Sequence, residues 1–116
     1  MANLVLSPPA KHLTVDRDQD YTHVITVPAN AAFPATSWSL EYSVTHPTTG
    51  TALFTKTATI VVTTAGSSSV DAVFTIPVAD TDTSSATVGI KYNWKFKRSD
   101  AGSEVNMDGG TVTYLR

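Results

Sequence analysis

Hydrophobic and polar residues alternate along most of this chain with a period of two. The clearest stretch is Thr36–Thr45, whose apolar positions recur at every second residue: Trp38, Leu40, Tyr42 and Val44. Successive side chains of a strand point to opposite faces of its sheet, so this alternation is typical of strands that bury one face. No window shows the apolar spacing that an amphipathic helix needs. The chain is therefore predicted to be all-β.

Seven stretches carry the alternating pattern, and turn-forming clusters such as HPTTG and TAGSS separate them. The stretches are His12–Val15, Asp20–Val27, Thr36–Thr45, Ala52–Thr63, Val70–Ile76, Val88–Lys97 and Glu104–Leu115. Ala52–Thr63 is long enough for a bend or for two short strands. About seven strands at spacings near a dozen residues favour an antiparallel sandwich of two sheets.

Aromatic side chains are expected to fill the space between these sheets. Trp38 and Trp94 are predicted to meet there, each burying about 200 Å². Around Trp94 the sequence YNWKFKR alternates rings with cations, a combination that can also mark nucleic-acid or sugar binding. Period two separates the two kinds of side chain onto opposite faces of the strand: Tyr92, Trp94 and Phe96 against Lys95 and Lys97. We therefore assign the rings to the core and the lysines to solvent.

Composition is that of one globular domain, residues 1–116. Hydrophobic residues make up 41% of the chain and charged ones 16%, and the formal net charge is −2. This balance argues against a nucleic-acid partner, which requires clustered Lys and Arg. No apolar run approaches the roughly 20 residues that span a bilayer, so no membrane partner is expected. The absence of cysteine excludes disulfides and thiolate metal sites.

Residues 1–11, MANLVLSPPAK, lie before the first predicted strand. They lack the basic start and the long apolar stretch of a secretory signal, so we expect synthesis and assembly in a cytoplasm. Two adjacent prolines favour an extended conformation. We predict that residues 1–11 form an extended docking segment.

The most suggestive polar cluster is the run of acids at every second position in HLTVDRDQDY, namely Asp16, Asp18 and Asp20. These acids match the first half of an EF-hand calcium loop. The second half fails, because Tyr21 stands where the loop needs glycine and Val27 where it needs a bidentate glutamate. We interpret the segment as a polar turn between two strands.

Other candidate groups do not form a constellation in the sequence. The three histidines, His12, His23 and His46, could in principle hold zinc, but nothing in the sequence shows that they converge, and no acid follows His12 or His23 at ligand-like spacing. The serine-rich AGSSS lacks the context of a nucleophile elbow or a phosphate cradle. The acid pairs Asp80/Asp82 and Asp100/Glu104 fall in turns. We predict no catalytic, cofactor-binding or metal-ligating residue, and no enzyme.

The closing strand is interrupted by Asp108–Gly110, which could close a hairpin or let the strand bulge. Ser99–Gly102 already supplies a hairpin turn before it. The bulge is therefore the preferred interpretation.

Several segments, taken in order, resemble a known family. They are HLTVDRDQDYTHVITV, FTIPVADTD, the aromatic strand, the SDAG turn and VNMDGGTVTYL, which together cover most of the chain. In this order they are similar to the immunoglobulin-like modules of tailed-phage virions, especially the N-terminal module of the baseplate upper protein family. The chain departs from that family at Arg17-Asp18, where the family has a Gly-containing turn, and in a looser spacing of Gly89 and Tyr92.

The resemblance implies an immunoglobulin-like sandwich and non-enzymatic structural work in a virion. Such a module would dock on other virion proteins and on copies of itself, in the tail or baseplate or on the capsid surface as a decoration or fibre attachment. The position in the particle, the docking partner and the copy number stay open.

The alternative is a carbohydrate-binding module that recognises a host-surface glycan. Sandwich lectins use exposed aromatic rings. The candidates for that role are Phe33, Tyr42, Phe54 and Tyr114.

Overall fold

A computed structural model describes residues 4–6, 11–31, 33–57, 59–100 and 105–116. Its elements are β1 (Leu4–Leu6), β2 (His12–Asp16), β3 (Tyr21–Val27), β4 (Leu40–Thr45), β5 (Ala52–Lys56), β6 (Val61–Thr64), β7 (Ala72–Val78), the 3₁₀ turn η1 (Asp80–Thr83), β8 (Lys91–Arg98) and β9 (Val105–Leu115). The all-β prediction is confirmed.

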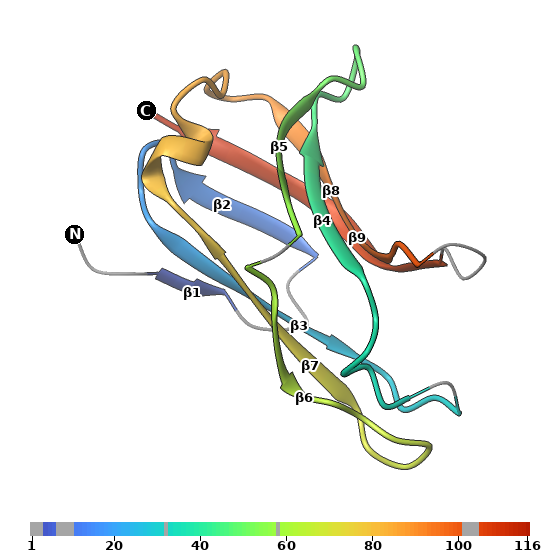
Figure 1. Cartoon of the computed structure of the whole chain (residues 1–116). Helices are drawn as coiled ribbons and strands as arrows, with labels where there is room; N and C mark the ends of the chain where they lie inside the picture. Colours follow the sequence, from blue (N-terminus) through green and yellow to red (C-terminus); the bar gives the residue numbers. More distant parts are fainter. Residues whose placement is uncertain (1–3, 7–10, 32, 58, 101–104) are drawn as a thin grey trace.

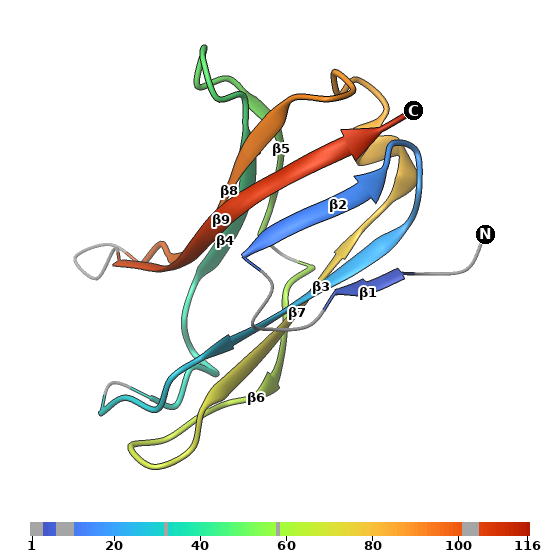
Figure 2. The same ribbon diagram turned by 180° about the vertical axis from the view of Figure 1, so that it is seen from behind.

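Two sheets pack face to face as a sandwich (Figures 1 and 2). One sheet has the strand order β1-β3-β7-β6 and the other has the order β2-β9-β8-β4-β5. Most neighbours are antiparallel, as predicted, but β1 lies parallel to β3 and β2 parallel to β9. The parallel pairs arise because β2 and β3 belong to different sheets. β2 is therefore free to lie beside the last strand of the chain instead of beside its successor.

The stretch Ala52–Thr63 forms two strands, one in each sheet. β5 pairs with Tyr42–Thr45 of β4 and β6 pairs with Val73–Thr75 of β7. Between them the chain crosses from one sheet to the other. The first half of β4 and the second half of β7 consequently have no neighbour on that side among the described residues.

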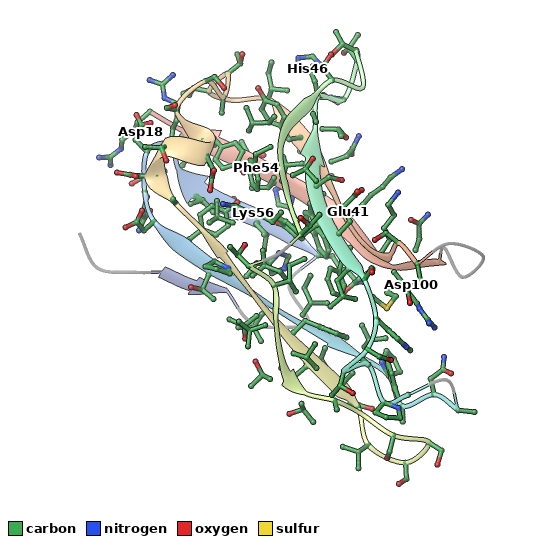
Figure 3. The ribbon with its side chains drawn as sticks, viewed as in Figure 1. Asp18, Glu41, His46, Phe54, Lys56 and Asp100 are labelled. Carbon is green, nitrogen blue, oxygen red and sulfur yellow. The ribbon has the colours of Figure 1, made fainter. Side chains whose placement is uncertain are left out.

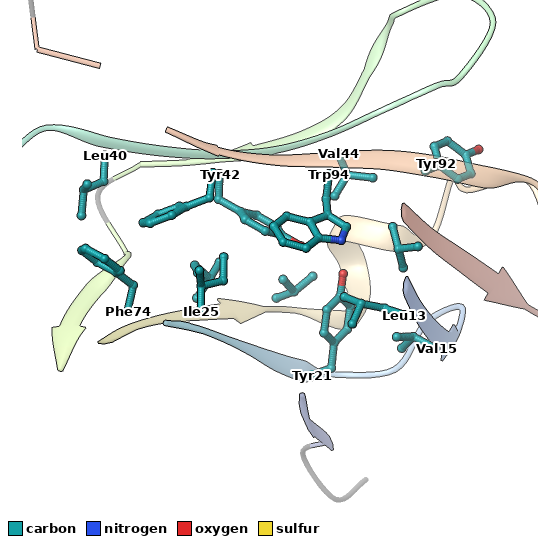
Figure 4. Close-up of a cluster of buried hydrophobic side chains, with 14 of the residues drawn as sticks. Leu13, Val15, Tyr21, Ile25, Leu40, Tyr42, Val44, Phe74, Tyr92 and Trp94 are labelled. Carbon is teal, nitrogen blue, oxygen red and sulfur yellow. The ribbon is translucent and has the colours of Figure 1, made fainter. Parts of the chain in front are cut away.

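Buried aromatic rings fill the space between the sheets (Figure 4). Trp94 is 1% exposed and packs against the rings of Tyr42, 6.1 Å away, and His23, 4.5 Å away, which also contact each other at 5.5 Å. As predicted for β8, the rings at Tyr92, Trp94 and Phe96 are buried while Lys95 is exposed.

The expected meeting of Trp38 with Trp94 is wrong. Trp38 precedes β4, is only partly buried, and packs on Phe33 at 5.0 Å and under Arg98 at 4.4 Å. The strand begins at Leu40, two residues later than the tryptophan. Trp38 therefore covers one end of the sandwich instead of entering its centre.

Two other predicted strand starts also lie outside the sheets. Val70 and Val88 are 51% and 41% exposed, and the strands that follow begin at Ala72 and Lys91. Both valines continue the alternating pattern into a connection, where no opposite sheet covers them.

β9 bulges, as predicted, but at Met107, one residue before the predicted Asp108–Gly110. Phe96 pairs with Asp108 and Lys97 with Asn106, so Met107 is the extra residue. The glycines that follow pair regularly with β8. Gly110 lies opposite Trp94 and directly beneath the Lys11 carbonyl, which accepts a hydrogen bond from the Trp94 indole at 3.3 Å.

Gly110→Ala is expected to destabilise the fold by about 3 kcal/mol, at the upper end of the range for overpacking. The added Cβ would overlap the Lys11 carbonyl oxygen and lie 2.8 Å from the Trp94 ring nitrogen. Chemical denaturation measures the loss. Gly109→Ala is the matched control, because the Cβ added there would lie 3.3 Å from its nearest neighbour, the Trp94 carbonyl oxygen. Equal losses in the two variants would contradict the packing shown here.

Candidate functional site

The run of alternating acids is a turn, as predicted, and it carries the chain from one sheet to the other. Its three carboxylates point to different partners. Asp16 faces Arg116 at 3.8 Å and Asp20 accepts a hydrogen bond from the Asp80 amide at 2.7 Å. Asp18 adopts a φ of 65° and is exposed at the surface (Figure 3). The acids therefore do not share a ligand position.

The three histidines are also far from converging. His12 contacts Thr111 on the outer face of the β2–β9 pair. The ring of His46 accepts hydrogen bonds from the Thr48 and Thr49 amides, at 3.1 and 3.3 Å, and so closes the β4–β5 hairpin. His23 is 2% exposed between the sheets. Each histidine has a structural contact of its own.

His23 belongs to a set of hydrogen bonds that join the two sheets inside the core. Its Nδ1 shares a hydrogen bond with the Tyr42 hydroxyl at 3.0 Å, and the Tyr21 hydroxyl meets the Tyr114 hydroxyl at 2.9 Å. His23 and Tyr21 come from β3, while Tyr42 and Tyr114 come from the opposite sheet. These bonds satisfy polar groups that would otherwise be costly to bury.

Burial shifts the pKa of each of these groups in the direction that favours the neutral form of the side chain. It lowers the pKa of His23 from 6.5 to about 4, against a smaller opposing effect of Asp108. Burial likewise raises the pKa of Tyr21, Tyr42 and Tyr114 above 10. All four side chains are therefore neutral at pH 7.

An alkaline titration is expected to show these raised phenol pKa values. A tyrosine whose pKa is higher in the folded than in the unfolded state stabilises the fold below pH 10, and that contribution is lost as the pH rises further. The tyrosinate absorbance of Tyr21, Tyr42 and Tyr114 should therefore appear only together with unfolding, measured in parallel by circular dichroism. Reversible ionisation of all three in the folded protein would contradict their burial.

The aromatic residues named for sugar binding are not exposed. Tyr42 and Tyr114 are fully buried, Phe33 is buried, and Phe54 is half-buried against Tyr42 with 6.2 Å between the ring centres. The expectation that they form an exposed platform is wrong. The cause is that Tyr42 and Tyr114 point to the inner faces of their strands, and Phe54 packs on Tyr42. Phe33 lies in the connection between β3 and β4 and packs on Trp38.

Asp82 and Asp100, one member of each predicted acid pair, hold structural contacts to other segments of the chain. Asp82 of η1 accepts a hydrogen bond from the Ala79 amide at 2.9 Å and forms an ion pair with Lys56 at 2.6 Å. Asp100 binds the Ser39 amide and the Arg98 guanidinium, and the Ser39 contact is the main reason why its pKa is lowered. Its predicted companion Glu104 lies outside the described residues.

No three of the described His, Asp and Glu side chains could hold a metal ion together. Figure 3 shows Asp18, His46 and Asp100 at three separate places on the rim of the sandwich. The surfaces of the described sheets that remain open to a partner include their backbone edges.

Among the described strands, four have a sheet neighbour on one side only: β1, β6, β2 and β5. Such edges present backbone N–H and C=O groups to which another strand can pair. We call β6, Val61–Thr64, the β6 edge. The predicted docking segment 1–11 is in part an edge itself, because Leu4–Leu6 pairs with β3 of the same chain. Residues 1–3 and 7–10 lie outside the described residues.

Two hollows flank the crossing between β5 and β6. One, of about 420 Å³, is bounded by Trp38, Leu40, Ile60 and Val62, next to the uncovered half of β4. The other, of about 400 Å³, includes Lys56, Thr59 and Pro77, next to the uncovered half of β7. Pro77 has no amide hydrogen to offer an added strand, which protects that half of β7. Sequence reasoning missed both hollows, because it left open where Ala52–Thr63 changes sheets.

No family model, no curated protein and no solved structure matches this chain. The described residues include no helix of the length and apolar character needed to cross a membrane.

Proposed function

We propose that this chain is a non-enzymatic structural protein of a tailed-phage virion. It docks on other virion proteins, in the tail or baseplate or on the capsid surface. The observation that carries the proposal is that the core and the surfaces open to partners are formed by different parts of each strand. The rings lie between the sheets, while strand edges and outer faces are left for contact with partners.

The fold is suited to such work because its stability comes from its own core. Aromatic stacking and the hydrogen bonds from Tyr21 and His23 to the opposite sheet hold the layers together. A domain of this kind keeps its shape when many copies are placed side by side. The resemblance of the sequence to immunoglobulin-like phage modules is the reason for proposing that these partners belong to a virion.

Mass spectrometry of purified phage particles tests the proposal. The particles are purified from cells infected with the phage whose genome encodes this chain. We expect the chain to be retained after gradient purification, with a fixed copy number. Tens of copies or fewer would place it in the baseplate or tail, and hundreds on the capsid surface. Its loss from particles that are otherwise complete would reject the proposal.

The carbohydrate-binding alternative has no support in the described residues. Three of its four candidate rings are buried and the fourth, Phe54, is half-buried.

A further inference from the structure

The β6 edge differs in charge from two of the other sheet edges. β2 includes His12 and Asp16, and β5 ends in Lys56, whereas β6 reads VVTT and has no ionisable side chain. The uncharged run is longer than the strand, because residues 57–70 contain no Asp, Glu, Lys, Arg or His. Charged side chains and prolines on edge strands discourage pairing with other chains. The β6 edge lacks both. Its register with β7 shifts between Val62 and Thr64, so the free backbone groups of this edge are not evenly spaced along the strand.

β1 is also uncharged, but it is shorter, with three residues against four in β6. The β6 edge also carries an exposed apolar side chain, since Val61 is 55% exposed. A strand added beside β6 would remove part of that surface from water, which is favourable at about 25 cal/mol per Å² of apolar area. β6, which is longer and has an exposed valine, is therefore the better edge for pairing.

The sheet surface next to this edge is uncharged as well. Val61 lies opposite Thr75, which lies opposite Val24, and in the next row Val73 lies opposite Thr26. The outer face of the other sheet contrasts with it, because there Lys95, Lys97 and Glu41 stand in neighbouring positions.

This lack of charge favours a second copy of the same chain as the occupant. In a two-fold symmetric contact the same patch is used on both molecules, and a residue near the axis meets its own copy. A charged patch would then place like charges together, at a cost in free energy. The β6 edge and the rows beside it can meet their own copy without that cost.

We propose that β6 pairs in antiparallel fashion with β6 of a second copy of this chain, which joins two four-stranded sheets into one. The inference deepens the proposed function by naming one surface through which copies would meet. A four-residue strand pair buries much less than the roughly 1,200 Å² of a stable interface. The pairing is therefore weak between two free molecules and is reinforced where many copies are held close together.

Val61→Lys tests the pairing, with Val88→Lys as its matched control. Both substitutions add one positive charge at an exposed valine, and Val88 lies in the connection before β8, away from the β6 edge. Sedimentation velocity of the full chain is measured from micromolar concentration to the solubility limit. Circular dichroism confirms that each variant is folded.

The unmodified chain is expected to show a concentration-dependent dimer, and Val88→Lys the same dimer. Val61→Lys should raise the dissociation constant at least about tenfold, because it replaces an exposed apolar side chain of the edge strand with a charged one that opposes pairing. A monomer at every concentration, or equal association of Val61→Lys and the unmodified chain, would overturn the inference. Neither result bears on whether the chain is found in virions, which the particle analysis decides separately.

Discussion

Lowering the pH from 7 to 4 is expected to cost the folded state about 3 kcal/mol through His23 alone. Burial lowers the pKa of this histidine from 6.5 to about 4 in the folded protein. A difference of one pKa unit corresponds to about 1.4 kcal/mol. The unfolded chain therefore takes up a proton between pH 6.5 and 4 while the folded chain does not, and stability falls across that window. Below pH 4 this contribution changes little further.

His23→Asn is the variant that isolates this effect. The asparagine amide can occupy the place of Nδ1 and keep a hydrogen bond to the Tyr42 hydroxyl, but it does not titrate. Urea denaturation at several pH values should show a steep decrease for the unmodified chain between pH 6.5 and 4. The decrease should be smaller by about 3 kcal/mol in the variant. Parallel curves for the two proteins would show that His23 is not the source.

Asp100 contributes in the same sense, because its pKa is also lowered in the folded state and its stabilising contribution is also lost as the pH falls. Its pKa is lowered mainly by the hydrogen bond from the Ser39 amide. A lowered carboxyl pKa stabilises the fold above the unfolded value and is lost as the pH falls through the folded value. That loss comes at more acidic pH than the histidine window, and both proteins share it. The difference between the unmodified chain and His23→Asn therefore reports His23.

The burial of His23 could be read from the sequence pattern, although its role could not. In YTHVITV, His23 is in phase with Tyr21 and Ile25, which the alternation places on one face of the strand. Period two thus predicts the face of a side chain whatever its type. The hydrogen bond to Tyr42 depends on which strand lies opposite in the other sheet, and alternation carries no information about that partner.

The strand pattern predicted most of the fold because burying one face is a local requirement. It was less reliable at the ends, where Val70 and Val88 continue the alternation into connections that no sheet covers. It also left open the crossing within Ala52–Thr63 and did not predict the parallel pair of β2 with β9. Both depend on contacts between residues far apart in the sequence. The β6 edge follows from that crossing, so it too required the structure.

Trp94→Ala is expected to destabilise the fold by about 4 kcal/mol, close to the limit for a single core substitution. The indole is 1% exposed, stacks on Tyr42, meets His23 edge to face, and donates a hydrogen bond to the Lys11 carbonyl. Its removal leaves a large cavity between the two sheets, and the surrounding rings can close it only in part. Thermal and chemical denaturation measure the loss.

Trp38→Ala is the informative comparison, because the alternating pattern alone assigns both tryptophans to the same core. The Trp38 ring is only partly buried and contacts Phe33 and Arg98 at one end of the sandwich. An exposed cation–π contact contributes about 0.5–1 kcal/mol, and with partial burial the total loss should stay near 2 kcal/mol. Fluorescence separates the two residues as well: the emission that remains in Trp38→Ala should come from a dry environment, and the emission in a folded Trp94→Ala from a more hydrated one. If the two losses were equal, Trp38 would have to lie as deep in the core as Trp94, contrary to the fold described here.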